Sequence, residues 1–190
     1  MNDSASSSGR TLFQVTLVVT LVFATAAIVV PFVGRVREDG AVAALNRTLE
    51  TLERACERYA TDTGRCSREY GTSASASHHT LSRQPPGMAG WKGPYLAHPL
   101  SDGSSSFGGY INVYDDLSSS NCSGFDLDGD GEKDATGPGN FVRLSNVPEE
   151  LAAAFDAVHD RSVPGDWRLT GRVQWRSGKL DVFLLELPPR

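Results

Sequence analysis

The first pattern along the chain is a continuous apolar run near its start. Val, Leu, Ile, Phe and Ala dominate it, and no charged residue stands between Arg10 and Arg35. A helix of about 20 apolar residues crosses a bilayer core. A secretory signal peptide is the alternative, but its apolar region is shorter and follows a basic segment, whereas residues 1–9 contain no Lys or Arg. The run therefore predicts a transmembrane helix over 10–34.

After the continuous apolar run, the apolar residues recur with the period of an α-helix. Apolar residues recur at steps of three and four, which places them on one face of an α-helix. This stripe consists of Val42, Leu45, Leu49, Leu52, Cys56 and Tyr59. Charged residues lie between them, and Glu50 and Arg54 stand one turn apart, where they can pair. We expect a helix over 35–60 that packs on a core and ends near Gly64. A coiled-coil seam is the alternative, but the stripe is short for one.

The middle of the chain predicts loops around one short strand. Residues 71–90 are rich in Ser, Ala, Pro and Gly and show no period, so we expect a long loop in which His78 and His79 are solvated. The aromatic residues of 91–96 are expected to pack this crossing against the long helix. Residues 110–114 alternate between apolar and polar, as in a strand.

The C-terminal part, 140–190, is expected to hold one helix and the rest of a sheet. The helix begins near Pro148, with Ser145 or Asn146 as its cap and two glutamates in its first turn. Its expected buried face consists of Leu151, Ala154, Phe155 and Val158. The expected strands are 141–144, 167–169, 172–175 and 180–187, the last two joined by a hairpin turn at Ser177 and Gly178.

Composition narrows the classes of function. The chain has 190 residues, of which 39% are hydrophobic and 8% aromatic, as in a folded domain rather than a disordered tail. The net charge of −5 and the scattered basic residues predict no nucleic-acid partner and no basic patch. No nucleophile motif, Walker motif or dinucleotide motif is visible, so we expect no enzyme activity.

Three cysteines leave their pairing open. They are Cys56, Cys66 and Cys122. Outside the cytoplasm two of them can form a disulfide, and we favour Cys56–Cys66 because these residues flank the expected helix end. Reduced thiols that act as small core residues are the alternative.

An acidic loop lies within 121–139. Alternate carboxylates on a glycine-bearing loop can converge on one Ca²⁺, which takes six to eight oxygen ligands. The expected ligands are Asp126, Asp128, Asp130 and Asp134, with the backbone carbonyl of Glu132. The spacing resembles the first half of an EF-hand loop, but Gly137 stands where that motif has a bidentate Glu. We therefore expect a Ca²⁺ loop of another fold. A solvated acidic turn without an ion is the alternative, and Mg²⁺ is less suited because it requires stricter geometry.

Two segments resemble type IV pilins and type II secretion pseudopilins. In the first, Gly9 stands where a prepilin peptidase cuts, and Thr11, Leu12 and Pro31 match the family in register. The second is Trp-Lys-Gly-Pro-Tyr-Leu at 91–96, which resembles the segment that follows the helix in major pseudopilins. Major pseudopilins also carry a Ca²⁺-binding loop late in the chain.

Two positions depart from the family pattern. Arg10 replaces the N-methylated Phe after the cut, and Gln14 replaces the Glu that helps to register a new subunit. The resemblance thus assigns processing to Gly9 and Arg10, and assembly to Gln14 and Pro31.

The resemblance implies a pilin-like α+β fold. In it a long N-terminal helix, half in the membrane and half in the domain, packs on a small antiparallel sheet. It also implies a leader peptide over 1–9 and a single inner-membrane pass over 10–34 with a cytoplasmic N-terminus. The domain over 35–190 is then periplasmic before it reaches a filament or the cell surface.

The implied function is structural. The chain is expected to be a subunit of a type IV pilus or of a type II secretion pseudopilus, with a Ca²⁺-stabilised loop. The implied partners are other pilin or pseudopilin subunits, the prepilin peptidase, the membrane and the inner-membrane assembly platform. The alternative is a membrane-anchored Ca²⁺-binding or adhesion domain that does not polymerise.

Overall fold

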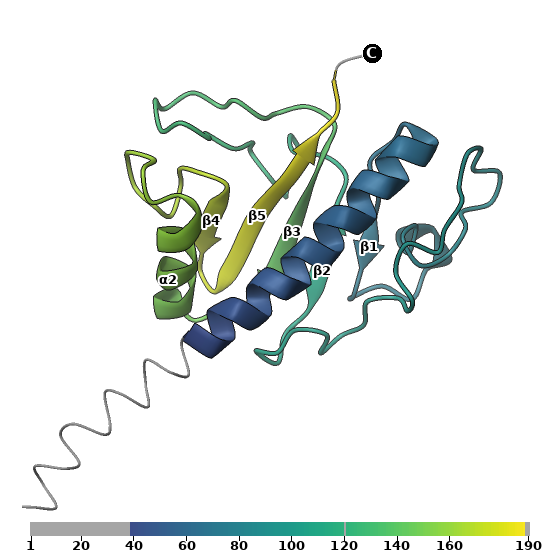
Figure 1. Ribbon diagram of the computed structural model, residues 1–190, viewed down its shortest axis with the longest axis horizontal. Helices are drawn as coiled ribbons and strands as arrows, with labels where there is room; N and C mark the ends of the chain where they lie inside the picture. Colours follow the sequence, from purple (N-terminus) through teal and green to yellow (C-terminus); the bar gives the residue numbers. More distant parts are fainter. Residues whose placement is uncertain (1–38, 120, 189–190) are drawn as a thin grey trace, which may run out of the picture. The chain divides into compact units, whose positions relative to one another are not determined.

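An antiparallel β-sheet organises the part of the chain that the computed structural model describes, residues 39–119 and 121–188 (Figure 1). Within these residues the sheet has five strands in the order β1-β2-β3-β5-β4. The strands are β1 (Glu69–Tyr70), β2 (Ile111–Tyr114), β3 (Gly139–Ser145), β4 (Val173–Arg176) and β5 (Lys179–Glu186). The chain divides into a unit Met1–Ala41, which lies almost wholly outside the described residues, and a unit Val42–Arg190, which contains the sheet.

A long helix over residues 39–63 lies across the sheet (Figure 1). The predicted stripe is its buried side, since Leu45, Leu49, Leu52, Cys56 and Tyr59 are each at most 6% exposed. The helix ends at Gly64, as its sequence predicts. Gly64 has a φ of 65°, and its N–H donates to the carbonyl of Ala60 at 2.7 Å. A glycine takes this left-handed conformation without a steric cost.

The two faces of the sheet differ because side chains alternate along a strand. On β3 and β5, Val142 pairs with Val182 and Leu144 with Leu180. These residues are buried and belong to the face covered by the helices, which we call the helix face. The intervening pairs, Phe141 with Phe183 and Arg143 with Asp181, belong to the opposite face, which we call the loop face.

The helix face is closed by the long helix and by α2 (Glu149–His159). A small cavity of about 70 Å³ is lined by Leu49 of the long helix, Phe155 of α2 and Val182 of β5, so all three elements meet there. Glu53 of the long helix accepts a hydrogen bond from Arg172 at 3.1 Å, just before β4. One part of the core of the described domain therefore lies on this face, and an apolar cluster around Phe125 and Phe141 forms another part on the loop face.

The α2 helix begins where its sequence predicts, but its buried face is different. Pro148 is the N-cap, so the expected cap at Ser145 or Asn146 was wrong, and two glutamates occupy the first turn. The buried residues are Leu151, Ala152, Phe155 and Asp156. The predicted face was wrong at Val158, whose side chain is 62% exposed, and at Ala154, which is half-buried. In a short helix that contains several alanines, small apolar side chains do not fix which side turns to the core.

The C-terminal hairpin confirms one prediction and corrects another. β4 and β5 pair through a turn in which Ser177 and Gly178 have φ values of 51° and 78°, as in the hairpin turns that match strand twist. Residues 167–169 are not a strand. The N–H groups of Leu169 and Thr170 both donate to the carbonyl of Asp166, which makes this segment a turn.

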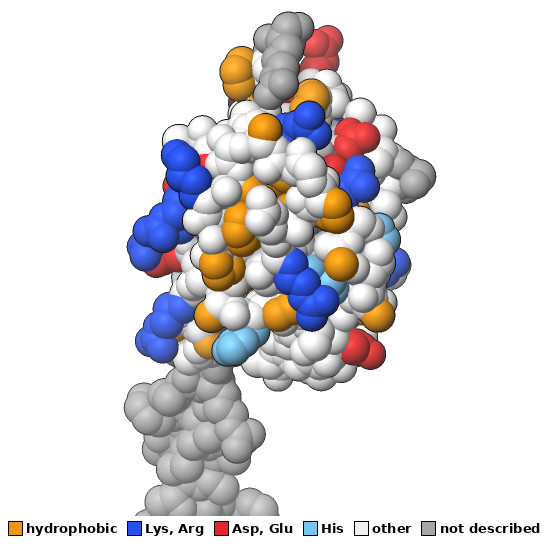
Figure 2. Space-filling view, turned by 90° about the vertical axis from the view of Figure 1, so that its right-hand side faces the viewer, with side chains coloured by type: hydrophobic (Ala, Val, Ile, Leu, Met, Phe, Trp, Pro, Cys, Tyr) orange, Lys and Arg blue, Asp and Glu red, His pale blue; other side chains and the backbone are white. Residues whose placement is uncertain are grey.

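The loops that follow β1 form the side of the domain seen in Figure 2. Apolar side chains gather near the middle of this face, with basic side chains around them (Figure 2). The crossing at 91–96 packs on the end of the long helix, as predicted. The ring of Tyr95 lies 5.7 Å from that of Tyr59, and its hydroxyl donates to Asp62 at 2.9 Å.

The expected pilin-like fold with a long N-terminal helix is wrong for the described part of the chain. The long helix there covers only residues 39–63 and lies on the sheet. Charged side chains occupy its outer side, as expected for the half of the helix that lies in the domain, and the helix includes no apolar span. These charged side chains include Glu50, Arg54, Glu57 and Arg58.

The expected single pass through the inner membrane is corrected as well. No helix within residues 39–119 and 121–188 has both the length and the apolar character that a membrane crossing needs. The expected cytoplasmic N-terminus and periplasmic domain depended on that helix. The leader over 1–9, the predicted helix over 10–34 and the positions Gly9, Arg10, Gln14 and Pro31 lie outside the described residues.

Candidate metal centre

The acidic loop is held at its base by a pair of backbone hydrogen bonds. Phe125 and Ala135 face each other, with N–H to carbonyl distances of 3.0 and 3.1 Å. The ring of Phe125 is fully buried and lies 6.1 Å from Phe141 and 5.6 Å from Phe183. The loop 125–135 is therefore fixed to the loop face of the sheet by one aromatic side chain.

Two glycines turn the loop back on itself. Gly129 and Gly131 have φ values of 78° and 95°. A Cβ on Gly129 would lie 2.1 Å from the carbonyl oxygen of Pro164, so this close approach excludes any side chain. The glycine turn thus also sets how closely the loop meets the segment before β4.

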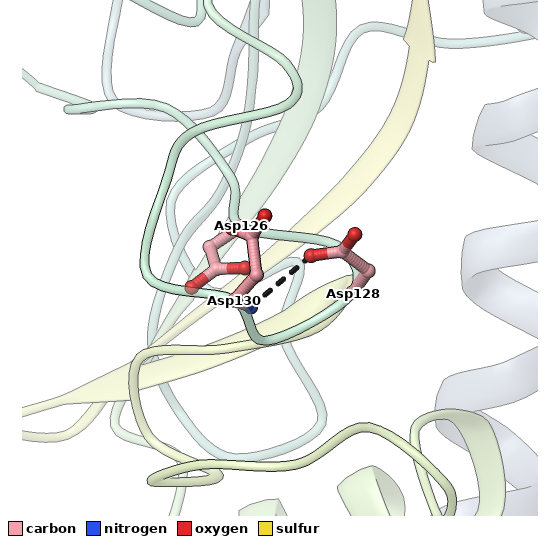
Figure 3. A group of neighbouring side chains, drawn as sticks. All are labelled: Asp126, Asp128 and Asp130. Atoms are coloured by element: carbon pink, nitrogen blue, oxygen red, sulfur yellow. Dashed lines mark hydrogen bonds between the residues drawn. The ribbon is translucent and has the colours of Figure 1, made fainter.

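Three carboxylates converge on this turn (Figure 3). Asp126, Asp128 and Asp130 each offer one oxygen, and these oxygens lie within 4.8 Å of one another. Asp126 is buried at 3% exposure, whereas the other two are exposed. Oxygens that bind one Ca²⁺ at 2.3–2.6 Å lie at most about 5 Å apart, so the three carboxylates fit a shared ion.

Backbone N–H groups hold the three carboxylates in place. Asp126 accepts from Gly129 at 2.7 Å and from Gly131 at 3.1 Å. Asp128 accepts from the N–H of Asp130 at 3.1 Å, and Asp130 accepts from that of Glu132 at 2.8 Å. Carboxylate oxygens have further lone pairs, so these bonds leave room for a cation.

The two other predicted ligands lie differently. Asp134 accepts a hydrogen bond from the N–H of Leu127 at 2.7 Å, so its carboxylate closes the base of the loop. Neither Asp134 nor the side chain of Glu132 belongs to the group of three. The structure thus brings together Asp126, Asp128 and Asp130 and gives Asp134 a structural contact.

A second acidic pair lies at the C-terminal end of α2 and was not predicted. Asp156 is 8% exposed, and its Oδ1 has no hydrogen-bond partner among the described residues. Burial, together with the neighbouring charge of Asp160, raises the pKa of Asp156 to about 6. Asp160 accepts from the N–H of Val173 at 2.8 Å. Helical spacing places these two carboxylates together, but only the rotation of α2 shows that they are buried.

The prediction that both histidines are solvated was wrong for His79. Its side chain is 3% exposed, with Nδ1 2.8 Å from Glu69 and Nε2 2.6 Å from the carbonyl of Ser73. The carboxylate of Glu69 also accepts from Leu81, at 3.0 Å, and from Ser82. This contact depends on the loop folding back onto β1, which no local pattern indicates.

The cysteines lie in two clusters. Cys56 is fully buried on the long helix and accepts a hydrogen bond from the hydroxyl of Ser67 at 3.3 Å. Burial raises the pKa of Cys56 to about 12, and the charge of the nearby Cys66 acts in the same direction. Cys122 packs with Phe125 on the loop face. The disulfide Cys56–Cys66 stays a prediction.

No family model, no curated protein and no solved structure matches this chain. The resemblance to pilins therefore rests on the matching residues named above alone.

Proposed function

We propose that the protein is a non-catalytic structural domain that binds Ca²⁺ through Asp126, Asp128 and Asp130. The observation that carries this proposal is the distance of at most 4.8 Å between their carboxylate oxygens. Like charges this close repel one another. A divalent cation removes that repulsion, and a loop that is already folded loses little entropy when it binds one.

The donor set favours calcium among the common cations. Every candidate ligand is an oxygen, which suits hard cations rather than Zn²⁺ or Cu²⁺. Ca²⁺ accepts irregular geometry and completes its shell with backbone carbonyls and water, whereas Mg²⁺ requires a near-ideal octahedron. The carbonyl of Glu132 and water molecules would supply the remaining ligands.

The contacts of the loop indicate what an ion would stabilise. The carbonyl of Asp126 accepts from the N–H of Gly171 at 2.6 Å, and Gly129 touches Pro164. An ion that orders the loop 125–135 would therefore also order the segment between α2 and β4. We infer a structural role for the ion, because it would fix two long connections on the sheet.

Thermal unfolding of EDTA-treated protein during titration with Ca²⁺ tests the proposal. We expect the melting temperature to rise and to saturate. A Ca²⁺ concentration about 100 times the Kd corresponds to about 2.7 kcal/mol of added stability. Mg²⁺ at the same concentration should give a smaller rise.

Two variants distinguish binding of Ca²⁺ at the three carboxylates from a general effect of negative charge. Asp128→Asn removes one anionic oxygen but keeps an acceptor for the N–H of Asp130, so it should weaken the response to Ca²⁺. Asp102→Asn removes an exposed charge from another loop and should respond as the parent does. Equal responses in all three proteins, or no response at all, would contradict the proposal.

A second candidate function is that of a filament subunit of the pilus or pseudopilus kind. The packing of Tyr95 against Tyr59 and Asp62 supports it, because this contact joins the long helix to the segment 91–96 that resembles major pseudopilins. Mass spectrometry of the chain from cells that carry a prepilin peptidase provides the test. A mature chain that begins at Arg10 would support the filament proposal, and an intact Met1 would refute it.

Crosslinking then distinguishes a filament from a domain that acts alone. Cysteines introduced at Val18 or Val22 should give crosslinked ladders in cells that assemble filaments. Monomers alone under the same conditions would favour the Ca²⁺-binding or adhesion domain that does not polymerise.

A further inference from the structure

The loop face of the sheet contains a cavity of about 380 Å³ that the sequence does not predict. Its floor is formed by β3, β4 and β5, and the chain at Asn121–Ser123 forms part of its wall. The charged side chains that line it are Arg143, Arg168, Arg176, Lys179 and Asp181. Four cations thus share the cavity with one carboxylate, in a chain whose net charge is −5.

The register of the sheet brings these charges together. Arg143 faces Asp181 across β3 and β5, and Arg176 faces Lys179 across the hairpin. The alternation of side chains places all four on the loop face. The basic residues are scattered in the sequence and predicted no patch, and this prediction was wrong because the register of the sheet cannot be read from their spacing along the chain.

Arg143 is held rigidly at the floor of the cavity. Its Nε and Nη2 each donate to Asp181 at 2.6 Å, and Nη2 also donates to the carbonyl of Asn121 at 2.7 Å. Its guanidinium lies 5.5 Å from the centre of the ring of Tyr114. Nη1 has no hydrogen-bond partner among the described residues, so two N–H donors remain for a ligand.

The cations at the hairpin are not neutralised. Arg176 and Lys179 are exposed and form no ion pair within residues 39–119 and 121–188. Arg168 differs from them, because it pairs with Glu149 and lies 3.6 Å from Asp166. The excess positive charge of the cavity therefore comes from the hairpin, beside the fixed donors of Arg143.

We propose that this cavity binds a small molecule through a phosphate or sulfate group. Arginine donors in a fixed plane together with a lysine ammonium are the groups that bind tetrahedral oxyanions in proteins. A concave, positively charged wall also concentrates anions from solution. The cavity is larger than a single oxyanion and is in the size range of small-molecule sites, so it has space for the organic part of a phosphate ester.

Calorimetric titration with inorganic phosphate, sulfate and glucose 6-phosphate tests this proposal. The protein is treated with EDTA first, because calcium phosphate is insoluble, and sodium chloride keeps the ionic strength constant. We expect saturable binding that chloride does not reproduce. Tighter binding of glucose 6-phosphate than of phosphate would assign an ester as the ligand, and equal binding would assign the free ion.

A matched pair of double variants locates the binding. Arg176→Gln with Lys179→Gln should weaken phosphate binding by roughly tenfold or more, because it removes two charged donors. Arg47→Gln with Arg83→Gln removes the same charge from exposed positions elsewhere and should change the affinity by less than about twofold. Melting temperatures of both variants should stay close to that of the parent, since all four side chains are exposed.

Two results would overturn the proposal. One is the absence of binding at concentrations of each anion up to about 50 mM, a range that reaches weak sites. The other is equal weakening in the two double variants, which would mean that net charge rather than the cavity attracts the anion. Neither result depends on whether the acidic loop binds Ca²⁺.

Discussion

The two faces of the sheet are built by the same strands and are stabilised differently. On the helix face Val142, Leu144 and Leu180 are removed from water by two helices. On the loop face, one residue farther along each strand, Arg143 and Asp181 form an ion pair, and the guanidinium of Arg143 lies over the rings of Tyr114 and Phe141. Burial of apolar area stabilises the first face. On the second face an apolar cluster around Phe125 and Phe141 is buried as well, and beside it specific polar contacts leave charged donors exposed to solvent.

The two faces also differ in the cavities that their covering segments leave open for ligands. A helix covers its face as a continuous layer, and the cavity where the long helix, α2 and β5 meet measures about 70 Å³. The loops cover their face incompletely and leave a cavity of about 380 Å³ and a turn with three carboxylates. Both candidate sites therefore lie on or beside the loop face.

The largest expected effect is a core substitution on the helix face. Leu180→Ala should lower the free energy of unfolding by about 3–4 kcal/mol, because it leaves a cavity at a fully buried position. Its neighbour Lys179 points to the loop face and is exposed. Lys179→Ala should change the free energy by at most about 0.5 kcal/mol. Urea denaturation measures both, and similar losses would show that the faces do not differ as described.

Removing one partner of the ion pair on the loop face should destabilise the protein more than replacing both partners by apolar residues. Arg143→Met leaves Asp181 without its partner at 17% exposure and should cost about 3 kcal/mol. The double variant Arg143→Met with Asp181→Leu should cost less than that single variant. A double-mutant cycle in urea measures the coupling. A double variant less stable than Arg143→Met would mean that the charges themselves are required.

The buried carboxylate of Asp156 should make the helix side of the domain sensitive to pH. Its pKa is raised to about 6 in the folded state, so the folded protein holds this proton more tightly than the unfolded chain does. The free energy of unfolding should therefore fall as the pH rises from about 4 to about 6. The stability that the protonated carboxyl of Asp156 contributes at low pH is then absent at pH 7. Asp156→Asn should remove this fall and add up to about 2 kcal/mol at pH 7. Thermal melts across this range check it, and a parallel fall in both proteins would contradict it.

The smallest expected effect lies on the outer side of the long helix. Glu50 and Arg54 form an ion pair at 3.3 Å with side chains 60% and 70% exposed. Glu50→Gln should change the free energy of unfolding by less than about 0.5 kcal/mol, because solvent and salt screen the pair. Melts at low and high salt give the measurement, and a larger loss would place this helix surface in contact with another part of the molecule.

Local periodicity predicted the elements that depend on neighbours in sequence. The apolar stripe of the long helix, its end at Gly64 and the hairpin at Ser177 are all set by residues within a few positions of one another. The acidic loop was found for the same reason, since its three converging carboxylates stand two residues apart.

Features that depend on distant segments were missed or misplaced. Arg143 meets Asp181 only because β3 pairs with β5 in one register. His79 is buried because its loop returns to Glu69, and Asp134 turns to Leu127 instead of joining the metal group. In each case the contacting residues are too far apart in the sequence for helical or strand periodicity, or a turn motif, to relate them.

The edges of the sheet carry a consequence for the behaviour of the protein at high concentration. β1 and β4 form the edges, and they have two and four residues. An open edge recruits strands from other chains in proportion to the length of unpaired backbone it offers. These short edges offer little unpaired backbone, so they disfavour the sharing of strands between copies of this domain and growth of the sheet into fibrils.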